Sequence, residues 1–112
     1  GDPAFDVAFC LNHLLLKCVW RPGWREQYMH CFEVFTETYG PAVSWEPWAA
    51  LEQRVAHLLP GLLLGRIDGK SPVEYLTDEA DQSQVRRVAV NLLQQPVGTL
   101  ADLLSVWQEE TG

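Results

Sequence analysis

The chain has 112 residues, which fits a single domain spanning residues 1–112, and 47% of them are apolar, enough to form a hydrophobic core. Its formal net charge of -7 leaves no basic patch to neutralise phosphates, so we expect no nucleic-acid partner. The cysteines number three, which does not suit a closed disulfide framework, and we therefore expect a reduced, cytoplasmic setting.

The first 20 residues predict a long, mostly buried helix around which the rest of the chain packs. Asp2 is expected to cap it, with Pro3 at the first helical position, and 21–23 (Arg-Pro-Gly) should end it. Its polar side chains form one stripe at helical spacing: Asp6, Cys10, His13 and Lys17. A membrane span is the competing interpretation, but Asp6 and Lys17 lie too far inside the apolar run, so we expect no membrane partner.

Two further helices and the start of a third are expected in the middle of the chain. One should run from Trp24 to Tyr39 and stop at Gly40-Pro41, with an aromatic stripe facing the core. The next should follow Ser44 as N-cap and kink or restart at Pro60-Gly61. The segment 71–74 (Ser-Pro-Val-Glu) then predicts the start of a short helix that ends near residue 76.

The last third of the chain predicts two more helices. The acidic and polar segment 77–83 is either a loop or the exposed first turn of a helix. The buried face of that helix should consist of Val85, Val88, Ala89, Leu92 and Leu93. Thr99 is expected to cap the final helix, with Asp102 at the capping-box position and Leu100, Leu103, Leu104 and Trp107 facing inward. Because no alternating run of strand length appears, the predicted fold is all-α, an irregular bundle of five to six helices.

Metal binding is the first chemistry that the polar residues suggest. Cys10 and His13 lie three apart on one helix, and His30 and Cys31 are adjacent on the next. Adjacent helical residues point about 100° apart, so His30 and Cys31 could not easily face one ion. We therefore expect no metal site, and expect the cysteines to be small core residues.

Two other polar features are candidate functional sites: the charged turn at 66–74 and Asp6. Arg66, Asp68, Lys70 and Glu74 place charges of both signs around one turn, where they either line the mouth of a pocket or form ion pairs on a solvated surface. Asp6 would be a carboxylate inside a buried helix, so it needs hydrogen-bond donors, and we expect them to come from another segment.

The N-terminal octapeptide carries a resemblance to a known family. Residues 1–8, GDPAFDVA, are similar to the segment that follows the metal-binding loop in the aminoglycoside phosphotransferase and choline kinase-like family, where Gly-Asp-Pro, two residues and Asp open a long buried helix. Residues 12–17 and 66–76 also resemble bacterial members of that family, and the resemblance covers essentially the whole chain.

The resemblance implies that this chain is the C-terminal helical part of an ATP-dependent small-molecule phosphotransferase, a piece of something longer that is inactive alone. Asp6 would then brace the catalytic loop from behind, and Arg66, Asp68 and Lys70 become candidates for the acceptor-substrate side. The catalytic loop, the metal-binding aspartate and the nucleotide-binding lobe would lie upstream, so ATP and Mg²⁺ are implied for the parent and no cofactor for this chain. Its partners would be the N-terminal kinase part and a small-molecule acceptor.

A different class of function stays open from the sequence: an independent helical interaction module that binds a partner helix in an apolar groove. For the kinase interpretation, removing the catalytic loop would leave an apolar face on the first helix. We therefore expect the isolated chain to self-associate as a two-fold dimer, with Phe5, Phe9 and Leu16 at or near the contact.

Overall fold

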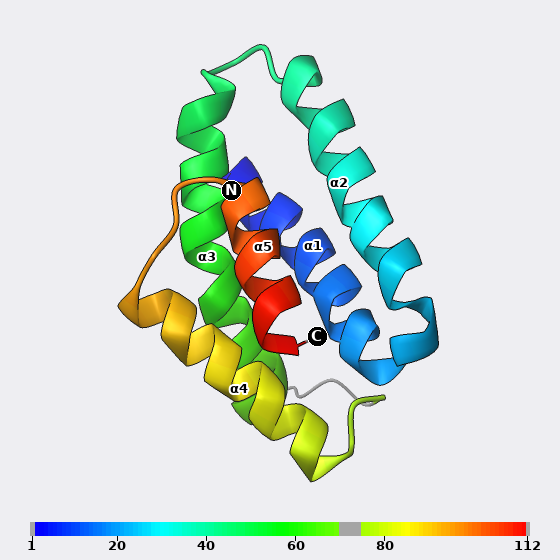
Figure 1. Ribbon diagram of the computed structural model, residues 1–112. Coiled ribbons are helices and arrows are strands. Elements are labelled where there is room, and N and C mark those ends of the chain that lie inside the picture. Colours follow the sequence, from blue (N-terminus) through cyan, green and yellow to red (C-terminus); the bar gives the residue numbers. More distant parts are fainter. Residues whose placement is uncertain (1, 70–74, 112) are drawn as a thin grey trace.

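The computed structural model describes residues 2–69 and 75–111, and within them every regular element is a helix (Figure 1). In chain order these are α1 (Pro3–Trp20), a short 3-10 helix η1 (Pro22–Trp24), α2 (Arg25–Ala42), α3 (Trp48–Asp68), α4 (Glu79–Gln94) and α5 (Leu100–Thr111). The predicted all-α bundle of five to six helices is confirmed. The helix expected to start at 71–74 falls outside the described residues. No helix of the described part is long and apolar enough to cross a bilayer.

Helix α1 packs mainly against α2 and α3, and α3 in turn carries α4 and α5. The start of α1 is the one that the sequence predicts, since the Asp2 carboxylate accepts a hydrogen bond from the Ala4 N–H at 3.0 Å and Pro3 opens the helix. It lies between α2 and α3, its two main neighbours (Figure 1). Nine of its residues are buried: Ala4, Val7, Ala8, Leu11, Asn12, Leu15, Leu16, Cys18 and Val19.

Helix α1, expected to be mostly buried, is exposed along one side. Phe5, Asp6, Phe9 and Cys10 are exposed, because two flanking helices cannot enclose a cylinder and no described segment covers the remaining stripe. Leu16, expected at or near an exposed contact, is instead fully buried, although helical spacing places it on the same side of α1 as Phe5 and Phe9.

Two predicted helix boundaries are wrong. Helix α2 continues through Gly40 and Pro41 to Ala42, and α3 begins at Trp48 rather than directly after Ser44. Helix α3 also passes Pro60 without the predicted restart. A proline inside a helix costs about 3 kcal/mol or more. Pro60 lies in the middle of the buried face of α3, between two fully buried leucines, and we attribute the continuity of the helix to that packing.

Gly40 allows α2 and α3 to approach closely where they are joined. A Cβ atom at this position would lie 3.1 Å from the Trp48 indole nitrogen, tighter than ordinary packing permits. The indole therefore lies against the α2 backbone, and its ring also contacts Tyr39, with the ring centroids 6.1 Å apart. Gly40 therefore favours the close approach of the indole, and no unusual backbone angle is involved.

The last two helices begin with side-chain caps. Asp78 accepts hydrogen bonds from the Ala80 and Asp81 N–H groups at 2.8 and 3.4 Å, so most of the acidic stretch 77–83 is the first turn of α4. The Thr99 hydroxyl accepts from the Asp102 N–H at 3.1 Å, which confirms the predicted cap of α5. Leu93, predicted to face the core, is 46% exposed, because the inward face of α4 is a narrow stripe that ends at Leu92.

The contrast between two leucines gives a direct test of this packing. Leu63→Ala removes a fully buried side chain of α3, and the free energy of unfolding should fall by about 2–5 kcal/mol. Leu93→Ala makes the same chemical change on the exposed side of α4 and should cost less than about 1 kcal/mol. Urea denaturation followed by circular dichroism measures both, and equal losses would show that α4 is packed differently.

Candidate functional site

The exposed stripe near the N-terminus of α1 is the first candidate surface. Asp6 is exposed and forms no hydrogen bond or ion pair with any residue that the structure describes. The rings of Phe5 and Phe9 stack beside it, with centroids 6.2 Å apart. The other segment expected to supply donors to Asp6 is therefore not found among the described residues.

A three-residue ionic network fixes the start of α1 to α3. Arg54 donates to the carboxylates of Asp2 at 3.0 and 3.1 Å and of Glu46 at 2.6 and 2.9 Å. The Arg54 guanidinium accordingly holds the pKa values of the Asp2 and Glu46 carboxyls below their usual range. This network orients the N-terminal turn on which Asp6 lies.

Farther along the same stripe, α1 contacts Arg66 near the end of α3 and Tyr75, the first described residue after 70–74. The His13 Nδ1 atom lies 3.5 Å from the Tyr75 hydroxyl, and the imidazole contacts the Phe9 ring edge to face. The Arg66 guanidinium lies over Phe9, 5.9 Å from the ring centroid. Burial, and then the positive charges of Arg66 and Lys17, lower the pKa of His13.

Of the charged turn singled out in the sequence, the two described members, Arg66 and Asp68, contact different helices. Asp68 accepts hydrogen bonds from Arg86 of α4 at 2.6 and 2.8 Å, whereas Arg66 lies toward α1. The ion pair considered between Arg66 and Asp68 is thus replaced by one between Asp68 and Arg86, which joins α3 to α4. Lys70 and Glu74 lie outside the described residues.

The cysteine and histidine residues do not converge on a common point. In the described part of the chain, no group of three or more histidine, cysteine, aspartate or glutamate side chains is arranged to hold a metal ion. The expectation that the cysteines are core residues holds for Cys18 alone, since Cys10 and Cys31 are exposed.

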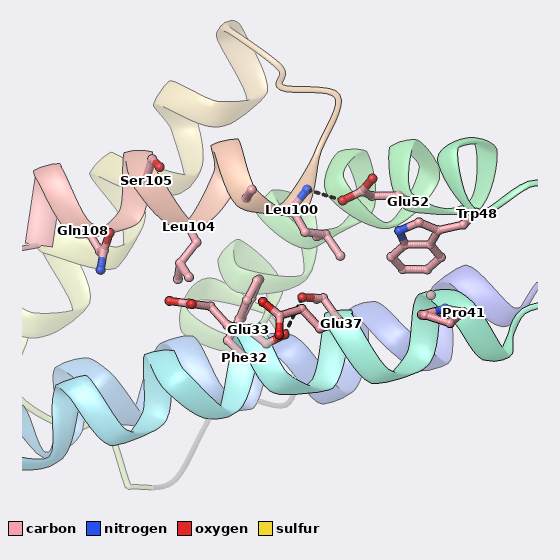
Figure 2. A pocket seen from close by; sticks show the side chains of 13 residues that line it. Phe32, Glu33, Glu37, Pro41, Trp48, Glu52, Leu100, Leu104, Ser105 and Gln108 are labelled. Atoms are coloured by element: carbon pink, nitrogen blue, oxygen red, sulfur yellow. Dashed lines mark hydrogen bonds between the residues drawn. The ribbon is translucent and has the colours of Figure 1, made fainter.

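A pocket of about 650 Å³ lies between α2, α3 and α5 (Figure 2). Its apolar wall consists of Phe32, Pro41, Trp48, Leu100 and Leu104. In the view of Figure 2 the side chains of Glu33 and Glu37 extend from α2 toward α5, and the Trp48 indole lies beside Pro41. The pocket is therefore a concave, mostly apolar surface with polar groups on its rim.

Carboxylates dominate the electrostatics of this pocket. Glu52 accepts a hydrogen bond from the Leu100 N–H at 3.0 Å and so stabilises the start of α5, whose N-terminal dipole favours a negative charge. Glu33 and Glu37 are one turn apart and exposed, and none of the lining residues, all of them described, is basic. The pocket thus favours a cation or a hydrogen-bond donor over an anion. This pocket was not predicted from the sequence, although the four-residue spacing of Glu33 and Glu37 places both carboxylates on one face of a helix.

Comparison with known proteins finds no matching family model, no matching curated sequence and no matching solved structure.

The thiols should differ sharply in reactivity. Burial raises the pKa of Cys18 to about 11, although Arg25 and the Trp107 indole oppose the shift, and its thiol donates to the Leu14 carbonyl at 3.3 Å. At neutral pH a disulfide reagent should therefore label Cys10 and Cys31 rapidly and Cys18 only after unfolding. Mass spectrometry after timed labelling identifies the sites. Rapid labelling of Cys18 in the folded chain would contradict its burial.

Proposed function

We propose that this chain is the C-terminal helical part of an ATP-dependent small-molecule phosphotransferase of the aminoglycoside phosphotransferase-like kind. The observation that supports this proposal most is the exposed start of α1. There the sequence of residues 1–6, GDPAFD, opens a helix whose other side is the core of the bundle, and Asp6 points away from that core.

The state of Asp6 agrees with a role outside the described chain. A carboxylate that accepts backbone N–H groups of a catalytic loop needs an exposed position on a rigid helix, without a competing cation beside it. Asp6 meets these conditions, because the nearby cation Arg54 is held by Asp2 and Glu46 instead. The stacked rings of Phe5 and Phe9 supply the apolar surface on which such a loop would pack.

In this proposal the chain also shapes the acceptor side of the enzyme. Arg66, Asp68 and Lys70 remain candidates for this side; of these, Arg66 lies over Phe9 of α1, Asp68 pairs with Arg86, and Lys70 lies outside the described residues. The pocket between α2, α3 and α5 is a further candidate, since it is concave and lined by the carboxylates of Glu33, Glu37 and Glu52. ATP, Mg²⁺ and the catalytic base belong to the N-terminal kinase part, and the chain alone has no phosphotransferase activity.

A variant of the longer protein tests the proposal. The reading frame upstream of Gly1 should encode a His-Gly-Asp motif, and in the enzyme that it specifies Asp6→Asn should lower kcat about 10–100-fold, because the catalytic loop loses its brace. The matched control, Asp102→Asn on the exposed side of α5, should leave kcat unchanged. Equal kcat values for the two variants, or an upstream frame without the motif, would contradict the proposal.

The exposed stripe of α1 also predicts how the isolated chain assembles. Two copies that bury Phe5 and Phe9 against each other should dimerise at micromolar concentration, and Phe9→Ser should weaken the dimer about tenfold. Phe9 is 39% exposed and Val90 of α4 is 38% exposed, so Val90→Ser is the matched control and should have no effect. Sedimentation equilibrium measures both. A wild-type chain that stays monomeric would show that this stripe is not an interface.

The second candidate, an independent interaction module, is favoured by one other feature. The outer face of α2 carries a mostly apolar groove of about 610 Å³ lined by His30, Cys31, Val34, Phe35, Thr38 and Tyr39. Such a groove could receive an amphipathic helix. A start codon close to Gly1, with no kinase motif upstream, would favour this function over the phosphotransferase.

A further inference from the structure

The junction between α1 and α2 combines exposed indoles with positive charge. We call a set of five residues at this junction the interhelical tip: Lys17 and Trp20 at the end of α1, Arg21 between α1 and η1, Trp24 in η1 and Arg25 at the start of α2. In Figure 1 this junction lies at the opposite end of the α1–α2 pair from the loop that joins α2 to α3. The tip is thus a turn at one extremity of the bundle.

Among the residues that the structure describes, the cations of the tip form no ion pair. No carboxylate of the described chain lies within ion-pair distance of Lys17, Arg21 or Arg25, whereas Arg54 and Arg86 are paired. Arg25 donates to the Gln108 carbonyl at 3.0 Å and keeps its charge. In the sequence no acidic residue occurs between Asp6 and Glu26, so Glu26 is the sequence neighbour that offsets part of this charge.

The indoles of the tip are presented outward. Trp24 is 57% exposed, and Trp20 is also exposed. The Arg21 guanidinium lies 4.3 Å from the centroid of the Trp20 ring, and the Trp20 and Tyr75 ring centroids are 4.8 Å apart. Neither of the pockets described above includes a residue of the tip. A partner protein would have to supply a cleft for each indole, whereas a lipid headgroup layer accepts projecting indoles without one.

We propose that the interhelical tip docks the protein peripherally on an anionic lipid surface. The tryptophans enter the headgroup region, and Lys17 and Arg21 approach the lipid phosphates and carboxylates, with their aliphatic stems along the apolar boundary. Arg25, held to the Gln108 carbonyl, adds its positive charge to the tip. This inference departs from the sequence-based expectation of no membrane partner, and it concerns a surface contact, not a membrane span. It goes beyond the proposed phosphotransferase and does not depend on it.

The net charge of -7 does not oppose such a contact. At physiological ionic strength, charges are screened beyond about 8 Å. The positive charge at the tip, and not the net charge of the chain, therefore decides how the tip interacts with an anionic surface. Asp6 and Trp20 are separated along α1 by about 21 Å, at 1.5 Å per residue. The start of α1 can therefore carry out its own function while the tip is bound.

Cosedimentation of the full chain with vesicles tests the proposal. The protein should partition onto phosphatidylcholine vesicles that contain phosphatidylserine and much more weakly onto phosphatidylcholine alone, and added salt should reduce binding. Trp24→Ser should lower the partition coefficient about tenfold, whereas Trp45→Ser, a control that is 56% exposed against 57% for Trp24, should leave it unchanged. Arg21→Gln should lower it about fivefold, and Arg87→Gln on α4 should not.

Circular dichroism confirms that each variant is folded. Binding that is equal on both vesicle types, or that falls equally with Trp24→Ser and Trp45→Ser, overturns the proposal. Absence of binding to either vesicle type also overturns it.

Discussion

The fold depends on the burial of one side of α1 between α2 and α3. The side chains of Leu11 and Leu15 are fully buried there, and burying a leucine contributes about 1.5–3 kcal/mol relative to leaving it exposed. Asn12 is the exception among these residues, since its amide is fully buried and donates to the Phe9 carbonyl. The other helices then pack on this three-helix arrangement, α4 chiefly against α3 and α5, and α5 against α4, α3 and α2.

Because only one side of α1 is used for packing, the other side can serve a function. Its start carries Asp6 with two stacked phenylalanines, and its end carries the interhelical tip. The two surfaces differ in sign, since the start presents a carboxylate and the tip presents cations. The carboxylate-lined pocket between α2, α3 and α5 is a third surface, built from other elements (Figure 2). A single buried helix thus positions two distinct candidate contacts at its two ends.

The parts of the fold that local chemistry determines could be predicted from the sequence. The caps at Asp2 and Thr99 need only a side-chain oxygen two or three residues before a free N–H, and the structure shows both. The failures concern competition between local preference and packing. Pro60 locally favours a break in the helix, but the buried face of α3 continues past it. Leu93 is apolar, yet it lies beside the buried face of α4 and not on it.

The candidate site was less predictable, because it depends on which helices become neighbours. Spacing alone grouped Arg66 with Asp68, but residues two apart on a helix point in different directions, and here they meet α1 and α4 respectively. The exposure of Asp6 could not be inferred from an apolar stretch, since periodicity does not reveal how many sides of a helix have partners. The glutamates of the pocket come from two helices that only the tertiary fold brings together.

Native-state hydrogen exchange measures most directly whether α1 is the element on which the bundle depends. The account predicts that the amides around Leu11 and Leu15 exchange only through global unfolding, with the same free energy as the amides around Leu59 and Leu63 in α3. Exchange of the α1 amides through local opening, while α3 and α4 remain protected, would show that the bundle is stable without α1 and would contradict the central claim.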